Sequence, residues 1–251
     1  MSQELPPPAP PPVPPAPPPQ MPRGDGDENG PRMPWEERDR LGYGDALIET
    51  VKLLVTAPSD AFARLRADGE LIWPLLFGLL FGWIGQFFTQ MWNLFTGQAM
   101  RAMLTGLGDL GDLDGLLQFT SPSLVGAIVS LILFPLFFAI GIFIGAGILH
   151  LCLMLVGATE ESPMGFEGTL KVLAYAQVAS LAAVVPIVGG LIVMVASLVL
   201  AVIGFTQVHK TTSGKAVVAV LIPVALCCLC CIGVIVLAVG GGLAAGLAGG
   251  G

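Results

Sequence analysis

The sequence has few charged residues: Asp, Glu, Lys and Arg make up 12% of its 251 positions, against about 25% in an ordinary soluble domain. This shortage excludes a soluble globular domain of this size. Five stretches have no charged residue, namely 71–97, 123–155, 172–185, 187–208 and 216–237. A membrane-spanning helix needs about 20 mostly apolar residues, and the third stretch reaches that length only together with its flanks. Runs this long are unlike the short alternating strands of a barrel, so we predict an all-α membrane protein with five transmembrane helices.

Motifs for catalysis and metal binding are also missing. There is no G-x-S-x-G, no H-E-x-x-H and no P-loop lysine. His150 is the single Asp, Glu, Lys, Arg or His inside the apolar stretches, whereas proton relays use several such groups. Cys227, Cys228, Cys230 and Cys231 fall on one helix, where they do not converge as zinc ligands do. We therefore expect no enzyme, no cofactor and no metal site, and we interpret the cysteines as packing residues.

The net charge of −7 excludes nucleic acid as a partner, because phosphate binding needs a basic face. Residues 1–40 are rich in proline and acidic residues, and they are predicted to form a disordered tail. This tail is either a solvated spacer or a polyproline ligand for a cytosolic partner. Residues 241–251 are predicted to be a Gly/Ala-rich C-terminal tail.

Residues 41–70 are predicted to form short interfacial amphipathic helices ahead of the five-span domain, which we place at 71–240. Leu47, Ile48, Val51, Leu54 and Val55 recur at helical spacing with polar residues between them. Such a helix lies most simply in the plane of the membrane surface.

The positions of lysine and arginine predict the orientation. With five spans, ten of the eleven lie on the side of the N-terminus, and only Arg101 lies on the other. Loops rich in these residues stay in the cytoplasm. We therefore predict a cytoplasmic N-terminus and an extracytoplasmic C-terminus.

Polar side chains form one stripe on the first span. Gln86, Gln90 and Asn93 are spaced i, i+4 and i+7, so they share a face. They either hydrogen-bond another helix or, with Tyr175 and Gln177, line a permeation path.

Glycine pairs suggest where helices approach closely. Gly78 and Gly82 on the first span, and Gly141 and Gly145 on the second, are each four residues apart. Such small-xxx-small pairs are typical of helix–helix contacts in membranes, so we predict that both pairs are packing notches.

The sequence resembles the Yip1 domain family, especially its bacterial branch. The resemblance lies in residues 49–52, 57–62, 166–176, 185–190, 203–210 and 213–217, followed by Pro223. It implies five spans, a cytoplasmic N-terminus and, for the bacterial branch, the cytoplasmic membrane. Eukaryotic relatives are associated with vesicle traffic and Rab-type GTPases, and they carry an acidic motif near the first span. This sequence has Trp73-Pro74-Leu75 at that place and lacks the acidic motif.

Two functions fit these observations. The first is a non-enzymatic membrane organiser or adaptor in the lipid bilayer, whose partners are membrane proteins, further copies of itself or a cytosolic ligand of the proline-rich tail. The alternative is a small transporter or channel for an uncharged or lipid-like substrate, lined by Gln86, Gln90 and Asn93.

Overall fold

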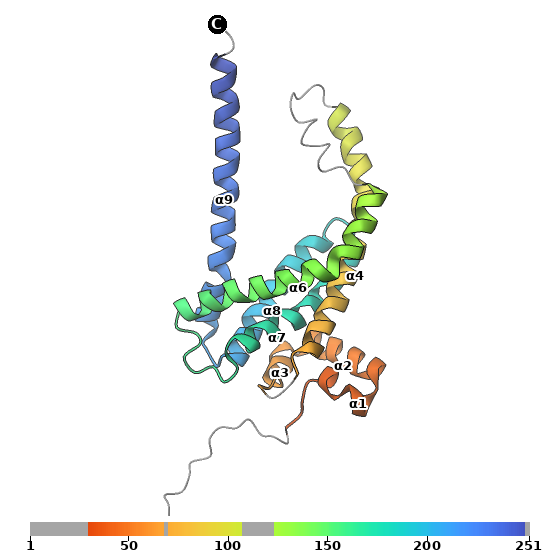
Figure 1. The fold of residues 1–251 in the computed structure, drawn as a ribbon, viewed down its shortest axis with the longest axis vertical. Coiled ribbons are helices and arrows are strands. Elements are labelled where there is room, and N and C mark those ends of the chain that lie inside the picture. The colour runs from red at the N-terminus through yellow and green to blue at the C-terminus, as the bar shows by residue number, and fades with distance from the viewer. Residues whose placement is uncertain (1–29, 68–69, 107–122, 249–251) are drawn as a thin grey trace, which may run out of the picture. The chain divides into compact units, whose positions relative to one another are not determined.

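The computed structural model describes residues 30–67, 70–106 and 123–248 (Figure 1). The chain divides into two units, 1–30 and 31–251, and the structure described below is that of the second. Its elements are η1 (Pro34–Glu37), α1 (Arg38–Leu41), α2 (Tyr43–Thr56), α3 (Pro58–Ala63), α4 (Ile72–Gly106), α6 (Leu124–Leu155), α7 (Gly165–Ala176), η2 (Gln177–Val184), α8 (Gly189–Val208) and α9 (Ser213–Ala248). No strand occurs within these ranges.

Within the described ranges, four helices are long and apolar enough to cross a membrane: α4, α6, α8 and α9. The predicted all-α membrane protein is thus confirmed, but the structure gives four such helices where the sequence predicted five. The difference lies in the third apolar stretch. There the backbone changes from an α-helix to a 3₁₀ helix at Gln177, so the stretch is divided between α7 and η2.

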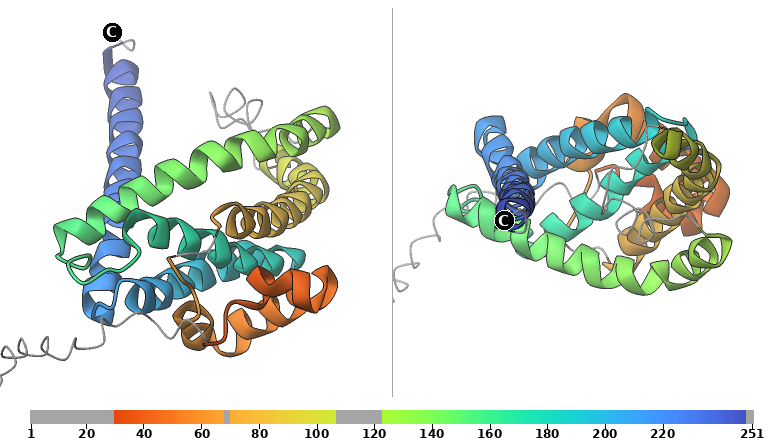
Figure 2. Two further views of the ribbon diagram at one scale, coloured as in Figure 1. Left: turned by 60° about the horizontal axis from the view of Figure 1, so that its bottom comes forward. Right: turned by 90° about the horizontal axis from the view of Figure 1, so that it is seen from above.

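The α7–η2 segment lies at the centre of the bundle, between α6 and α8 in Figure 2. Its side chains are mostly buried, including those of Thr169, Lys171 and Tyr175, none of which is exposed. Because the other helices cover it, this segment holds Thr169, Lys171 and Tyr175 away from lipid.

Close contacts fix the direction of each neighbour. A Cβ added at Gly78 of α4 would meet Ala174, and one at Gly85 would meet Ser180. Further along, the indole nitrogen of Trp92 donates a hydrogen bond to the Ala183 carbonyl over 3.0 Å. The helix α4 therefore runs parallel to α7–η2 from Ala174 to Ala183.

The helix α6 runs antiparallel to α4. The ring of Phe134 lies 3.1 Å from a Cβ built on Gly82, and the Trp83 indole nitrogen donates to the Leu131 carbonyl over 2.9 Å. Aromatic side chains of α6 thus fill the groove that the α4 glycines leave.

In the described part of the chain, Gly141 and Gly145 do not form the contact that was predicted for them. A Cβ at either position would meet no described atom within 4 Å. The packed face of α6 instead carries Ile142 and Ala146, which are buried. Because α6 is apolar all round, the spacing of its glycines did not indicate which face packs.

The predicted boundary of the N-terminal tail at residue 40 is also wrong. Met33, Pro34 and Trp35 are buried, and the chain is helical from Pro34 to Leu41. The predicted disorder of residues 1–29 lies outside the described residues. Residues 33–40, the last part of the predicted tail, are therefore packed and mostly helical.

The predicted helices of residues 41–70 are present as α2 and α3, but the face of α2 that packs on the protein carries Ala46, Thr50 and Leu54. Two residues of the predicted apolar face, Ile48 and Val55, are exposed. The core of the protein takes one side of α2 and leaves these two side chains on the other.

The last helix, α9, continues to Ala248, so residues 241–248 are helical and do not belong to a separate tail. Its first turns pack on α6 and α8 through Ala216, Ala219 and Val220. Beyond them, the described side chains from Leu221 to Val236 are exposed or half-buried.

Candidate functional site

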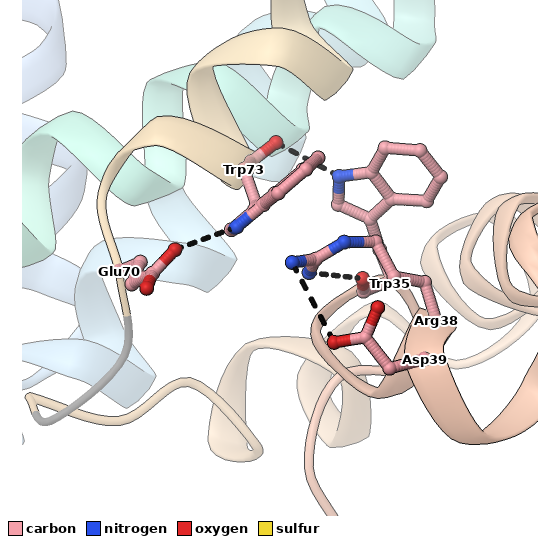
Figure 3. Close-up of polar contacts among 5 residues, drawn as sticks. All are labelled: Trp35, Arg38, Asp39, Glu70 and Trp73. Carbon is pink, nitrogen blue, oxygen red and sulfur yellow. Dashed lines mark hydrogen bonds and ion pairs between the residues drawn. The ribbon is translucent and has the colours of Figure 1, made fainter.

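The N-terminal segment is clamped onto the start of α4 by two tryptophans and an arginine (Figure 3). The indole nitrogen of Trp35 donates to the Trp73 carbonyl over 2.8 Å. The Arg38 guanidinium lies 3.2 Å from the centre of the Trp73 ring and donates to the Trp35 carbonyl. The Trp73 indole nitrogen in turn donates to Glu70 over 2.7 Å. We call Trp35, Arg38 and Trp73 the N-terminal clamp.

The clamp is tied to the interior of the bundle. The backbone N–H of Trp35 donates to the buried Thr50 hydroxyl over 2.8 Å, and the Trp35 ring packs on Phe77. The Tyr175 hydroxyl of α7 donates to Glu36 over 3.4 Å. A segment held by stacking and by side chains from α2, α4 and α7 is part of the folded core.

A buried lysine joins α7 to the chain that follows α3. The Lys171 ammonium donates to the Arg66 carbonyl over 2.7 Å and lies 2.7 Å from the Glu167 carboxylate. Its side chain has no exposed surface. A buried charge is tolerated only with such partners, so Lys171 fixes the chain that leads from α3 into α4.

A second polar cluster lies where α6 and α8 end. Both ring nitrogens of the fully buried His209 are hydrogen-bonded, Nδ1 to the Ser162 hydroxyl at 2.7 Å and Nε2 to the Thr169 hydroxyl at 3.0 Å. The same Thr169 hydroxyl lies 2.9 Å from Nδ1 of His150. We call Ser162, His209, Thr169 and His150 the histidine chain.

Burial, and then the neighbouring His150, lowers the pKa of His209 from about 6.5 to about 4. Near neutral pH the His209 ring is therefore uncharged, which suits a residue whose two ring nitrogens are hydrogen-bonded to neutral hydroxyls. The histidine chain can hold the connections 156–164 and 209–212 together by neutral hydrogen bonds.

This pKa predicts a pH dependence of stability. The unfolded chain takes up a proton on His209 near pH 6.5 and the folded chain only near pH 4, so stability is full above pH 6.5 and falls as the pH drops toward 4. We expect a total loss of roughly 3 kcal/mol, since the pKa is lowered by about 2.5 and each pKa unit is worth about 1.4 kcal/mol. Thermal melts in detergent at several pH values measure it. His209→Gln is the control, and an equally steep pH dependence in that variant contradicts the assignment.

The residues of the predicted polar stripe do not converge on one site. Gln90 donates to the Ser130 hydroxyl of α6 over 2.5 Å, while Gln86 is half-buried and Asn93 is exposed. Two roles were considered for the stripe, hydrogen bonding between helices and lining a permeation path. The contact of Gln90 with Ser130 is of the first kind. Tyr175 and Gln177 belong to the central segment, and the Tyr175 hydroxyl is directed to the N-terminal clamp.

Of the predicted notches, Gly78 and Gly82 lie against α7 and α6. Gly85, one turn further, is equally close-packed, although its spacing from Gly82 is i+3.

Among the described residues, no group of three or more His, Cys, Asp or Glu side chains is arranged to hold a metal ion. All five cysteines have free thiols, four of them exposed on α9.

Sequence reasoning missed the N-terminal clamp and the histidine chain. A tryptophan directly after a proline-rich stretch, at Pro34-Trp35, was the available signal for the first. For the second, the signal was a histidine at the end of each of two apolar stretches, at 150 and 209.

The Yip1 domain model matches residues 52–235. The chain belongs to the Yip1 domain family. No curated protein and no solved structure matches it. The matched residues extend from the second half of α2 into α9, and they include Trp73 and the histidine chain. Trp35 and Arg38 precede the matched range, so two residues of the N-terminal clamp lie outside it.

Proposed function

We propose that this Yip1 domain protein is a non-enzymatic membrane adaptor, whose N-terminal segment presents a partner-binding arm from a fixed point. The observation that carries the proposal is the N-terminal clamp, which holds Trp35 and Arg38 on the start of α4 shortly after the proline-rich and acidic residues of 1–30. An arm anchored at its base holds a ligand near the membrane at high effective concentration. A free spacer needs no such anchor.

We also propose that α7 and η2 together form the fifth crossing. At about 1.5 Å and 2.0 Å per residue, their 20 residues extend about 34 Å, enough for a hydrocarbon core of about 30 Å. In support, the segment runs beside α4 from Gly78 to Trp92. The N-terminus then lies in the cytoplasm and the C-terminus outside. As in the bacterial relatives, we assign the protein to the cytoplasmic membrane.

Single cysteines test this topology in a background without the five native ones. Val188 lies between η2 and α8, and Thr212 lies between α8 and α9. With five crossings, a membrane-impermeant maleimide added outside intact cells labels Val188→Cys and leaves Thr212→Cys unlabelled. With four crossings and a cytoplasmic N-terminus, the pattern is reversed. The reversed pattern would refute the fifth crossing.

Proximity labelling in native membranes tests the adaptor. We expect neighbours labelled around the intact protein to be lost when the prolines at 6–19 are replaced by serine and alanine, while membrane insertion is unchanged. An unchanged set of neighbours contradicts the proposed arm.

The alternative, a transporter for an uncharged or lipid-like substrate, predicts flux into liposomes that Gln90→Leu abolishes. Ser130→Ala is the matched control, because it removes the same hydrogen bond and leaves Gln90 in place. Flux lost only in the Gln90 variant would favour transport over the adaptor.

A further inference from the structure

A polar pocket of about 200 Å³ lies between the connections that follow α6 and α8. Two lysines and two glutamates line it, Lys210, Lys215, Glu160 and Glu161, and His209 of the histidine chain forms part of its wall. Neither the clamp nor the proposed adaptor arm uses this pocket.

The pocket lies at the boundary of the apolar region. The long apolar runs of α6 and α8 end at Leu155 and Val208, and that of α9 begins at Ala216. Leu151 and Leu155 of α6 and Leu221 of α9 are exposed beside this end of the bundle. In a bilayer, this level holds lipid headgroups, while the exposed leucines face acyl chains.

The four charges of the pocket cancel, two positive and two negative. An anion alone would face Glu160 and Glu161, and a cation alone would face Lys210 and Lys215. A ligand with both a phosphate and an ammonium group satisfies both pairs. Lys215 also donates to the Gly157 carbonyl over 2.7 Å, which keeps its ammonium at the pocket and compensates the negative end of α6.

The backbone at Lys210 is held in an unusual conformation. Its φ is +49°, and the Thr211 N–H donates to the Thr206 carbonyl, which is the bond that ends a helix at a left-handed residue. Glycine is the usual residue there, because a side chain in this conformation is strained. At the corresponding position after α6 the chain does have a glycine, Gly157. The lysine therefore places a positive charge at the pocket, at a position where the backbone conformation alone favours glycine.

From this geometry we propose that the pocket binds the headgroup of a zwitterionic phospholipid with a primary ammonium, that is, a phosphatidylethanolamine. Lys210 and the hydroxyls of Thr211 and Thr212 face the phosphate, and Glu160 and Glu161 accept hydrogen bonds from the ammonium. Phosphatidylcholine has the same charges, but its quaternary ammonium cannot donate these bonds.

Native mass spectrometry of the full chain, released from vesicles of equal parts phosphatidylethanolamine and phosphatidylcholine, tests the proposal. We expect bound phosphatidylethanolamine to exceed phosphatidylcholine by about fivefold, the effect of about 1 kcal/mol from charge-assisted bonds. The variant Glu160→Gln/Glu161→Gln is expected to reduce this preference to about twofold or less. Glu49→Gln, on helix α2, is the matched control, and it is expected to keep the preference for phosphatidylethanolamine.

Lys210→Asn tests the phosphate side, because asparagine tolerates the left-handed backbone and carries no charge. It is expected to lower total lipid retention while the melting temperature is maintained. A water-soluble headgroup, glycerophosphoethanolamine, is expected not to compete at concentrations where the lipid binds, which distinguishes a membrane lipid from a free metabolite. Equal retention of the two lipids, or a preference that the double variant keeps, would overturn the proposal.

Discussion

Replacing Gly78 with leucine is expected to prevent α4 from packing against α7. A Cβ at this position would lie 2.8 Å from the Ala174 carbonyl oxygen and 3.0 Å from its Cα. Both are backbone atoms, so no side-chain rotation relieves the clash. We expect the free energy of unfolding to fall by about 3 kcal/mol or more, at the upper end of overpacking effects. Thermal unfolding in detergent, followed by tryptophan fluorescence, measures the loss.

Gly141→Leu on α6 is the matched control. It makes the same change in a helix of similar length, at a position where an added Cβ meets nothing within 4 Å. Its melting temperature is expected to equal that of the natural protein or exceed it, because leucine favours a helix more than glycine does. Equal loss of stability in the two variants would show that the α4–α7 contact is not what distinguishes them.

Replacing Trp35 with alanine is expected to release the N-terminal segment from the bundle. The variant loses the hydrogen bond to the Trp73 carbonyl and the ring contacts with Tyr43, Trp73 and Phe77. Removing a buried tryptophan side chain typically costs about 3–5 kcal/mol. Limited proteolysis should cut near Gly42 at a much higher rate, and the melting temperature should fall.

Ile48→Ala is the control for Trp35→Ala, since Ile48 is 63% exposed and lies on α2, in the same N-terminal region. Two truncations give a second comparison, one removing residues 1–29 and the other residues 1–38. They differ only in the segment that carries Met33, Trp35 and Arg38. If both truncated proteins melt at the same temperature, the clamp contributes nothing to stability.

The sequence was sufficient to locate the long helices, because α4, α6, α8 and α9 each overlap a long apolar stretch without charge. The central segment was harder to interpret. Lys171 lies next to an apolar stretch that is too short to span a bilayer by itself, and its environment depends on Glu167 and on the distant Arg66 carbonyl. No local pattern encodes the contact between Lys171 and Arg66.

Two parts of the candidate sites depended on contacts between distant residues. Trp35 follows so many prolines that composition assigned it to the tail, yet its indole meets Trp73, 38 positions away. His209 is buried, and its ring is hydrogen-bonded to Ser162 of the connection 156–164 and to Thr169 of α7, both distant in the sequence. In α6, a helix apolar on every side, periodicity gave no direction, and Gly141 and Gly145 were assigned to the wrong face.

The burial of α7–η2 has a consequence for biogenesis. A segment with Glu167, Thr169 and Lys171 in its first turns partitions poorly into lipid by itself, because each charged residue opposes insertion. Its partners on α4 and α6 precede it in the chain and leave the ribosome first. Stable entry of the proposed α7–η2 crossing into the bilayer should therefore await these two helices and be guided by protein contacts, with α8 closing over it afterwards.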